Sequence, residues 1–71
     1  MWNARVEMKL FDAVYLNDDL PNQGLAKGQA GVILDVYHSP TLAYEVEFCD
    51  NDGKTISCLA LSPEQLSQTL D

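Results

Sequence analysis

The stretch at residues 28–37, GQAGVILDVY, constrains the fold of this chain more than any other. Two glycines three positions apart precede a run in which five of six residues are apolar. Glycine supplies the positive φ of a tight turn or allows the backbone to be approached closely. Alternation then predicts two faces of a strand, one with Val32, Leu34 and Val36 and the other with Ile33, Asp35 and Tyr37. We therefore expect a sharp turn that leads into a central strand of a small sheet.

Strict alternation over residues 43–48 predicts the clearest half-buried strand in the chain. Tyr44, Val46 and Phe48 share its apolar face, and two glutamates occupy the other face. A β-prone run at residues 11–16 predicts the first strand.

A hairpin is expected to follow residues 43–48. Asp52 and Gly53 favour a two-residue turn of the primed type, and residues 55–61 return as the next strand. This register places Val46 opposite Leu59, so that an apolar residue faces an apolar residue.

The remaining segments connect and close the sheet. Residues 17–24 are rich in turn formers and predict a loop, after which Leu25 is expected to return to the core. Ser62 as N-cap and Pro63 at the first helical position predict a short helical turn that places Leu66 on the barrel end. Four to five short strands with one C-terminal helical turn predict a mainly β fold, a small antiparallel SH3-like barrel.

The composition is that of one small, acidic globular domain. The chain has 71 residues, of which 46% are hydrophobic, and this length is near the lower limit for an independent core. Eleven acidic against four basic residues give a net charge of -7. Nucleic acids and anionic membranes require a basic patch, so we expect neither as a partner. A basic protein is compatible with this charge, although the demand for solubility also explains an acidic surface.

The sequence shows neither a membrane-spanning run nor a signal peptide, and this bears on the expected cellular location. No run approaches the ~20 apolar residues of a transmembrane helix, and residues 1–7 lack the pattern of a signal peptide. We expect a cytoplasmic protein with an N-terminal extension at residues 1–7 and a single domain at residues 8–71. Cys49 and Cys58 form no C-x-x-C pair and are expected to be buried or half-buried thiols in a reducing compartment.

In order and spacing, these segments resemble a small family of uncharacterised bacterial proteins, domain of unknown function 4926. The matching segments are Lys9-Leu10-Phe11-Asp12, Asp19-Leu20-Pro21, Gly24-Leu25, Gly28, Gly31-Val32, Val36-Tyr37, Tyr44-Glu45-Val46-Glu47-Phe48, Asp52-Gly53 and Gln65-Leu66. The resemblance covers about residues 8 to 66 and implies an SH3-like barrel without an established activity. It also implies a small neutralising or adaptor protein that acts on another protein, antitoxin-like or immunity-like. The glycine-valine core is similar to KOW-type barrels too, but those that bind RNA are typically basic here, unlike this chain.

The candidate partner-binding residues form an acidic surface with a tyrosine at its centre. An aromatic residue surrounded by charge is typical of hot spots at protein interfaces. The alternative is that these residues form an ordinary solvated outer face. A pair of aspartates in the loop after the first strand adds further negative charge. The candidates are Tyr37, Asp35, Glu45, Glu47, Asp18 and Asp19.

No set of residues predicts catalysis or ligation. His38 is the only histidine, and no motif supplies the nucleophile and orienting acid that a catalytic base requires. The acidic turn at residues 50–53 lacks the distant glutamate of a calcium loop. We therefore expect no catalytic, cofactor-binding or metal-binding residues and no enzyme activity.

These observations favour a non-enzymatic protein-interaction module, in its most concrete form a neutraliser of a basic partner protein. The alternative is a small structural or adaptor subunit of a larger enzyme complex. A homodimer formed through an open sheet edge is a further alternative.

Overall fold

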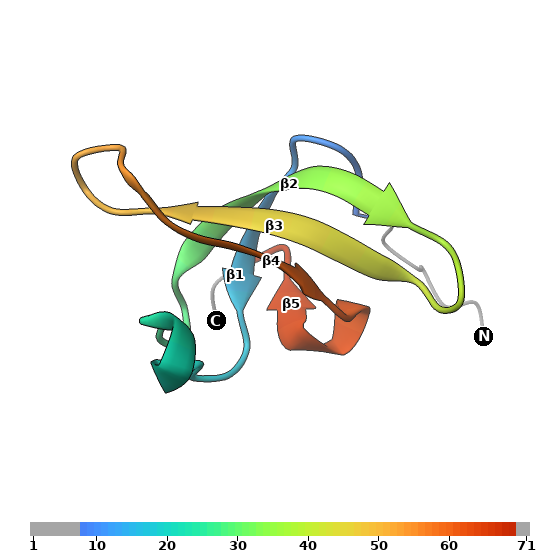
Figure 1. Ribbon diagram of the computed structural model, residues 1–71, viewed down its shortest axis with the longest axis horizontal. Coiled ribbons are helices and arrows are strands. Elements are labelled where there is room, and N and C mark those ends of the chain that lie inside the picture. Colours follow the sequence, from blue (N-terminus) through green and yellow to red (C-terminus); the bar gives the residue numbers. More distant parts are fainter. Residues whose placement is uncertain (1–7, 70–71) are drawn as a thin grey trace.

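The computed structural model describes residues 8–69, so the expected N-terminal extension lies outside the described residues. The chain forms a five-stranded antiparallel sheet that curls into a half-barrel (Figure 1). The elements are β1 Ala13–Leu16, the 3-10 turn η1 Pro21–Gln23, β2 Ala30–Tyr37, β3 Ala43–Cys49, β4 Thr55–Leu61, the 3-10 turn η2 Pro63–Gln65 and β5 Leu66–Ser67. The expected small antiparallel barrel is confirmed, and its C-terminal helical turn is η2.

The strand order in the sheet is β4-β3-β2-β1-β5. The three long strands β2, β3 and β4 lie side by side, while the shorter β1 and β5 curl away below them (Figure 1). Within residues 8–69, β4 and β5 are the two edges of the sheet and do not pair with each other, so the half-barrel is open between them.

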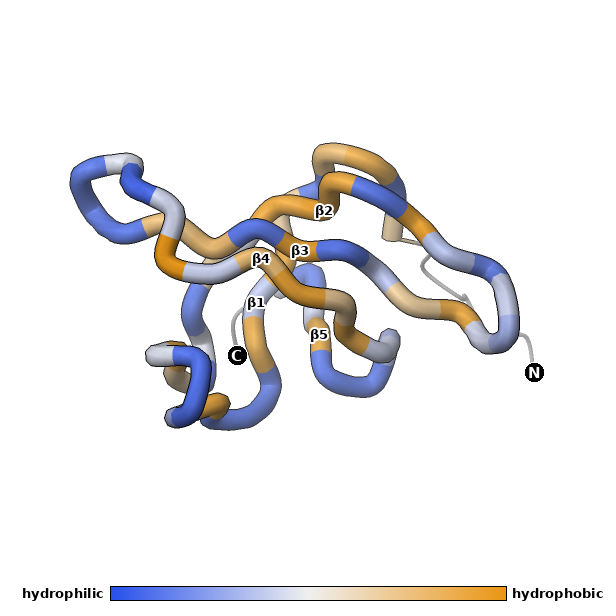
Figure 2. The backbone as a smooth tube through the Cα atoms, viewed as in Figure 1, coloured by the Kyte–Doolittle hydropathy of each residue, from blue (hydrophilic) through white to orange (hydrophobic). Residues whose placement is uncertain are grey.

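The core lies on the concave face, where alternate residues of the strands meet. Hydrophilic and more apolar positions alternate along β3 (Figure 2). Tyr44, Val46 and Phe48 are buried, as expected. The full set of buried apolar residues is Val14, Leu16, Leu25, Ile33, Tyr44, Val46, Phe48, Leu61 and Leu66. The predicted return of Leu25 to the core is therefore confirmed, as is the position of Leu66.

A β-bulge in β2 corrects the faces assigned to this strand. Ile33 pairs with Val46 and Asp35 pairs with Glu45, so Leu34 has no partner of its own in β3. Ile33 is 0% exposed, whereas Val32 and Leu34 are 39% and 40% exposed. The expected division of the strand, with Val32, Leu34 and Val36 on one face and Ile33, Asp35 and Tyr37 on the other, was therefore wrong. One additional residue at the bulge reverses the alternation that precedes it.

The first strand begins at Ala13 and not at Phe11, as the β-prone run had suggested. The backbone N–H of Asp12 donates to the Lys9 carbonyl at 3.0 Å, and the Lys9 N–H donates to Asp12 Oδ2 at 2.9 Å. These two bonds close a turn in which Phe11 has a φ of 70°. Local hydrogen bonding by the Asp12 carboxylate therefore overrides the strand propensity of the run.

The hairpin between β3 and β4 has the expected register in its centre, where Val46 pairs with Leu59. Its turn differs from the expectation, because the Asp50 N–H donates to the Lys54 carbonyl at 2.8 Å across a three-residue loop. Gly53 has a φ of 83°, which fits a three-residue loop ending in a left-handed residue. A register shift after Phe48 compensates for the longer loop.

The two glycines before β2 have different roles. Gly28 has a φ of 87° and donates its N–H to the Leu16 carbonyl at 2.7 Å, so it forms the turn that leads into the strand. Gly31 lies within β2 opposite Phe48, where the absence of a side chain leaves room for the aromatic ring. Both uses of glycine expected from the sequence are thus present.

Candidate partner-binding face

Four of the candidate residues lie together on the convex side of the sheet, opposite the core. Asp35 pairs with Glu45 between β2 and β3, and the Tyr37 hydroxyl donates to Glu45 Oε1 at 3.2 Å. Glu47 lies two residues further along β3, and both glutamates are half-buried. We call these four residues the acidic face.

Donors from β4 reach the glutamates of the acidic face. The Cys58 thiol donates to Glu45 Oε2 at 3.1 Å, and the Thr55 hydroxyl donates to Glu47 Oε2 at 2.7 Å. These donors are neutral, so they orient the carboxylates without cancelling their charge. Such preorganised carboxylates are suited to accept charge-assisted hydrogen bonds from lysine or arginine.

The carboxylates alter the titration of their two neighbours. The hydrogen bond to Glu45, followed by desolvation and the charges of Glu45 and Glu47, raises the pKa of the Cys58 thiol. Partial desolvation, followed by the hydrogen bond to Glu45 and the charges of Glu45 and Asp35, raises the pKa of the Tyr37 hydroxyl. Both groups therefore act as neutral hydrogen-bond donors near neutral pH, and neither is activated as a nucleophile.

Exposed apolar side chains lie beside the acidic face, and the sequence reasoning missed them. The bulge turns Val32 and Leu34 of β2 outward. Next to this strand, the turn that contains Leu10 and Phe11 is anchored by the Phe11 N–H, which donates to the Ile33 carbonyl at 2.7 Å. Leu10 is 49% and Phe11 73% exposed. Alternation could not reveal the outward turn of Val32 and Leu34, because no residue in the strand marks the bulge.

The two loop aspartates are not part of the acidic face. They follow the end of β1, near the start of β2, whereas Tyr37 ends β2. Asp19 Oδ1 accepts a hydrogen bond from the Lys27 N–H at 2.8 Å, and Asp18 is exposed. Asp19 thus has a structural role in ordering the loop before β2.

The other candidate chemistry residues are dispersed. Cys49 and Cys58 are free and exposed, which corrects the expectation that they would be buried or half-buried. Both lie on the outer surface because they alternate with inward-facing residues of β3 and β4. His38 is exposed just beyond the end of β2. Within residues 8–69, no three His, Cys, Asp or Glu side chains are grouped to hold a metal ion.

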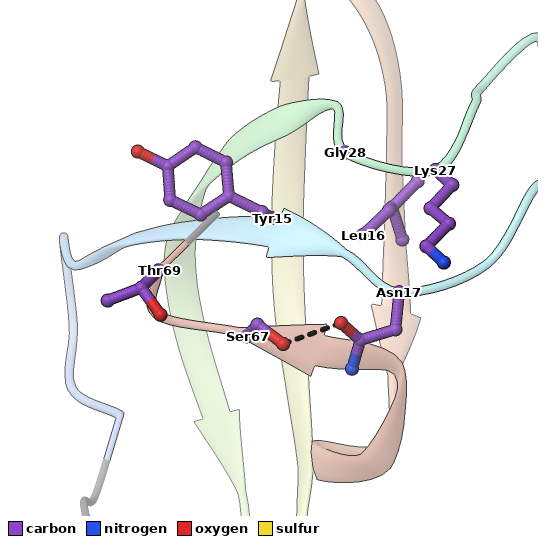
Figure 3. A pocket seen from close by; sticks show the side chains of 7 residues that line it. All are labelled: Tyr15, Leu16, Asn17, Lys27, Gly28, Ser67 and Thr69. Atoms are coloured by element: carbon purple, nitrogen blue, oxygen red, sulfur yellow. Dashed lines mark hydrogen bonds between the residues drawn. The ribbon is translucent and has the colours of Figure 1, made fainter. Parts of the chain in front are cut away.

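A pocket of about 430 Å³ lies where β1 and β5 meet the loop before β2 (Figure 3). Its polar groups are largely used within the fold: the Ser67 hydroxyl donates to Asn17 Oδ1 at 2.5 Å, and Asn17 Nδ2 donates to the Glu64 carbonyl at 2.9 Å. These bonds fasten β5 to the end of β1. The polar side chains of Asn17 and Ser67 thus hold the fold together, and we assign no ligand to this pocket.

The family model described as a domain of unknown function, DUF4926, matches residues 10–68. The chain belongs to this family. The match confirms the resemblance seen in the sequence and spans all five strands of the half-barrel. No curated protein and no solved structure gives a significant match.

The acidic face of this DUF4926 domain lies wholly within the matched residues. In the part of the chain that the structure describes, no helix is long and apolar enough to cross a membrane.

Proposed function

We propose that this DUF4926 domain is a non-enzymatic protein-interaction module whose acidic face binds a basic protein. The observation that carries the proposal is the Tyr37 hydroxyl bonded to Glu45, with the Asp35 and Glu47 carboxylates close by on the same face. The carboxylates would steer a basic partner, and the half-exposed tyrosine ring would supply contact area.

The most concrete form of this function is an antitoxin-like or immunity-like neutraliser. A toxin or nuclease that acts on nucleic acid has a basic cleft, and carboxylates compete there for the side chains that would bind phosphate. The small size of the chain and its net charge of -7 support this form. The two free, exposed cysteines support action in the reducing cytoplasm, where thiols persist unpaired.

A second candidate function is that of a small structural or adaptor subunit in a larger enzyme complex. The exposed Phe11, Val32 and Leu34 favour it, because permanent interfaces are more apolar than transient ones. The two functions differ in their response to salt. A complex steered by carboxylates weakens as ionic strength rises, whereas burial of apolar surface persists.

The test is co-purification of the tagged full-length chain from its source organism at low and high salt. For a neutraliser we expect one stoichiometric basic protein that high salt releases. Binding should be lost with Tyr37→Ala and Glu47→Lys and kept with Glu64→Lys. The Glu64 variant makes the same charge change at an exposed residue of η2, away from the acidic face. A large assembly that survives high salt would support the subunit function, and equal loss of binding in all three variants would contradict a specific acidic face.

A further inference from the structure

β4 is an edge strand whose outer side is unpaired in the described residues, and this suggests how a partner would bind. In residues 8–69, β4 pairs with β3 on one side and with no strand on the other, next to the opening of the half-barrel. An edge strand presents unpaired backbone donors and acceptors to any extended chain that approaches it. Natural edges are usually protected by charged residues or proline, but β4 has the sequence TISCLAL and contains neither.

The free part of this edge is its second half. At its start, Ser57 donates its hydroxyl to Gln23 Oε1 at 3.4 Å, so η1 approaches the strand there. A register shift also falls between the pairs of Phe48 and Cys49, which disturbs the first residues of β4. Residues 58–61 pair regularly with β3 and adjoin the opening, so a strand could add there.

We propose that the basic partner binds by adding a β-strand to residues 58–61 of β4, a strand in which lysine or arginine alternates with apolar residues. This inference rests on the proposed function and specifies the binding mode and the chemistry of the partner segment. Main-chain hydrogen bonds to the edge provide affinity in strand addition, and alternate side chains provide specificity.

The carboxylates next to the outer side of β4 are the reason why we expect basic residues in the partner strand. Cys58 pairs with Glu47, and Ala60 pairs with Glu45. A strand added to β4 would lie about 10 Å from β3, two strand spacings away. The small side chains of Cys58 and Ala60 leave the space between them open, so the long stem of a lysine or arginine can cross β4 and reach the carboxylates.

The inner side of β4 explains the apolar residues. Leu61 is buried in the core, and Leu59 is half-buried against it beside the open edge. Inward side chains of an added strand would cover Leu59 and close part of the opening. The two sides together require the alternating pattern, because successive residues of a strand point to opposite faces.

The charge of the chain argues against a second copy as the occupant. Pairing of two β4 edges would place the Glu45 and Glu47 carboxylates of both copies on one continuous sheet, in a protein of net charge -7. Repulsion between the carboxylates of the two copies opposes the dimer at low salt and is screened at high salt. A partner with basic residues gains from the same carboxylates.

The test uses the full-length protein and a short capped peptide of alternating lysine and valine as the probe. The control peptide has the same residues with alternate backbone nitrogens methylated, which keeps the charge and removes the donors that pair with an edge. We expect binding of the probe at low salt, at least about tenfold weaker binding of the control, and slower amide hydrogen exchange at residues 58–61 when the probe is bound. Equal binding of both peptides, no binding of the probe, or no protection in β4 would each overturn the inference.

Two variants with the same charge change locate the site. Ala60→Lys places a cation beside Glu45 on the edge, whereas Ala26→Lys adds the same charge at an exposed loop residue. We expect the first to weaken probe binding at least about tenfold and the second to change it little; equal effects would overturn the inference. A dimer that the probe cannot dissociate would show that a second copy occupies the edge and would overturn it as well.

The inference and the proposed function fail separately. If the host partner binds in a salt-sensitive way but Ala60→Lys does not weaken it, strand addition is wrong and the acidic-face function stands. If the probe binds as expected but no basic protein co-purifies from the host, strand addition stands and the neutraliser function fails.

Discussion

Gly31 of β2 and Phe48 of β3 are register partners, and the aromatic ring lies directly against the glycine. A Cβ added at Gly31 would come within 2.7 Å of Phe48 Cε1 and 2.7 Å of Val46 Cγ1. Both neighbours are 0% exposed and lie at the centre of the core, so neither can move aside freely. The close approach of this glycine and this ring fixes how β2 packs in the sheet.

We expect Gly31→Ala to lower the free energy of unfolding by about 1–3 kcal/mol, the usual cost of overpacking a core. Chemical denaturation monitored by circular dichroism measures the change. In a Phe48→Leu background the same substitution should cost less, since the smaller side chain leaves space for the methyl group. An equal cost in both backgrounds would show that the ring is not what Gly31 accommodates.

Phe11 presents a different constraint, since its φ of 70° lies in the left-handed region that favours glycine. Its side chain is 73% exposed, so little buried surface is lost on its removal. We expect Phe11→Gly to raise the free energy of unfolding by about 0.5–1 kcal/mol, the strain relieved less the entropy that glycine adds to the unfolded chain. Leu10→Gly, one residue earlier in the same turn, should lower it instead. Destabilisation by both substitutions would mean that the Phe11 side chain stabilises the fold.

Asp50 organises the β3–β4 turn through its side chain. Its Oδ1 atom accepts hydrogen bonds from the N–H of Asp52 at 2.8 Å and from the N–H of Lys54 at 2.9 Å. We expect Asp50→Ala to lower the free energy of unfolding by about 1–2 kcal/mol, because it removes both bonds. Asp50→Asn keeps an acceptor oxygen and should recover most of the loss, while Asn51→Ala serves as the neutral control. A full loss in the Asn variant would assign the effect to charge and not to the turn.

The sequence predicted most of the sheet because its signals are local. Alternation over residues 43–48 and the apolar pairing of Val46 with Leu59 depend only on the two-residue period of strands, and both are confirmed. The capped turn before Leu66 was also predicted from a local pattern, the spacing of Ser62 and Gln65. The structure confirms it, because the Ser62 N–H donates to the side-chain oxygen of Gln65 at 3.0 Å.

The errors arose where one residue alters the alternation or a side chain competes with the strand. The bulge at Leu34 reversed the face of Val32, and the Asp12 carboxylate converted the start of the first strand into a turn. The grouping of Asp35 with Tyr37 was nevertheless retained, because both residues follow the bulge and keep their relative phase. The link from Glu45 to Cys58 was not foreseen, since it depends on how long side chains lie across two strands.

That link leads to a prediction on thiol reactivity. The hydrogen bond to Glu45, desolvation and the charges of Glu45 and Glu47 raise the pKa of Cys58, so its thiolate fraction at mildly alkaline pH is lower than that of an ordinary thiol. Glu45→Gln removes the negative charge and should lower this pKa, which increases the thiolate fraction at the same pH. In a Cys49→Ser background, where Cys58 is the thiol that reports, we expect alkylation by iodoacetamide at pH about 8 to become severalfold faster with Glu45→Gln. Glu64→Gln, a distant exposed position, should leave the rate unchanged. The pH–rate profile separates charge from access, because relief of charge shifts the midpoint to lower pH, whereas better access raises the plateau without moving it. A raised plateau with an unchanged midpoint would show that Glu45 shields the thiol and does not hold its proton.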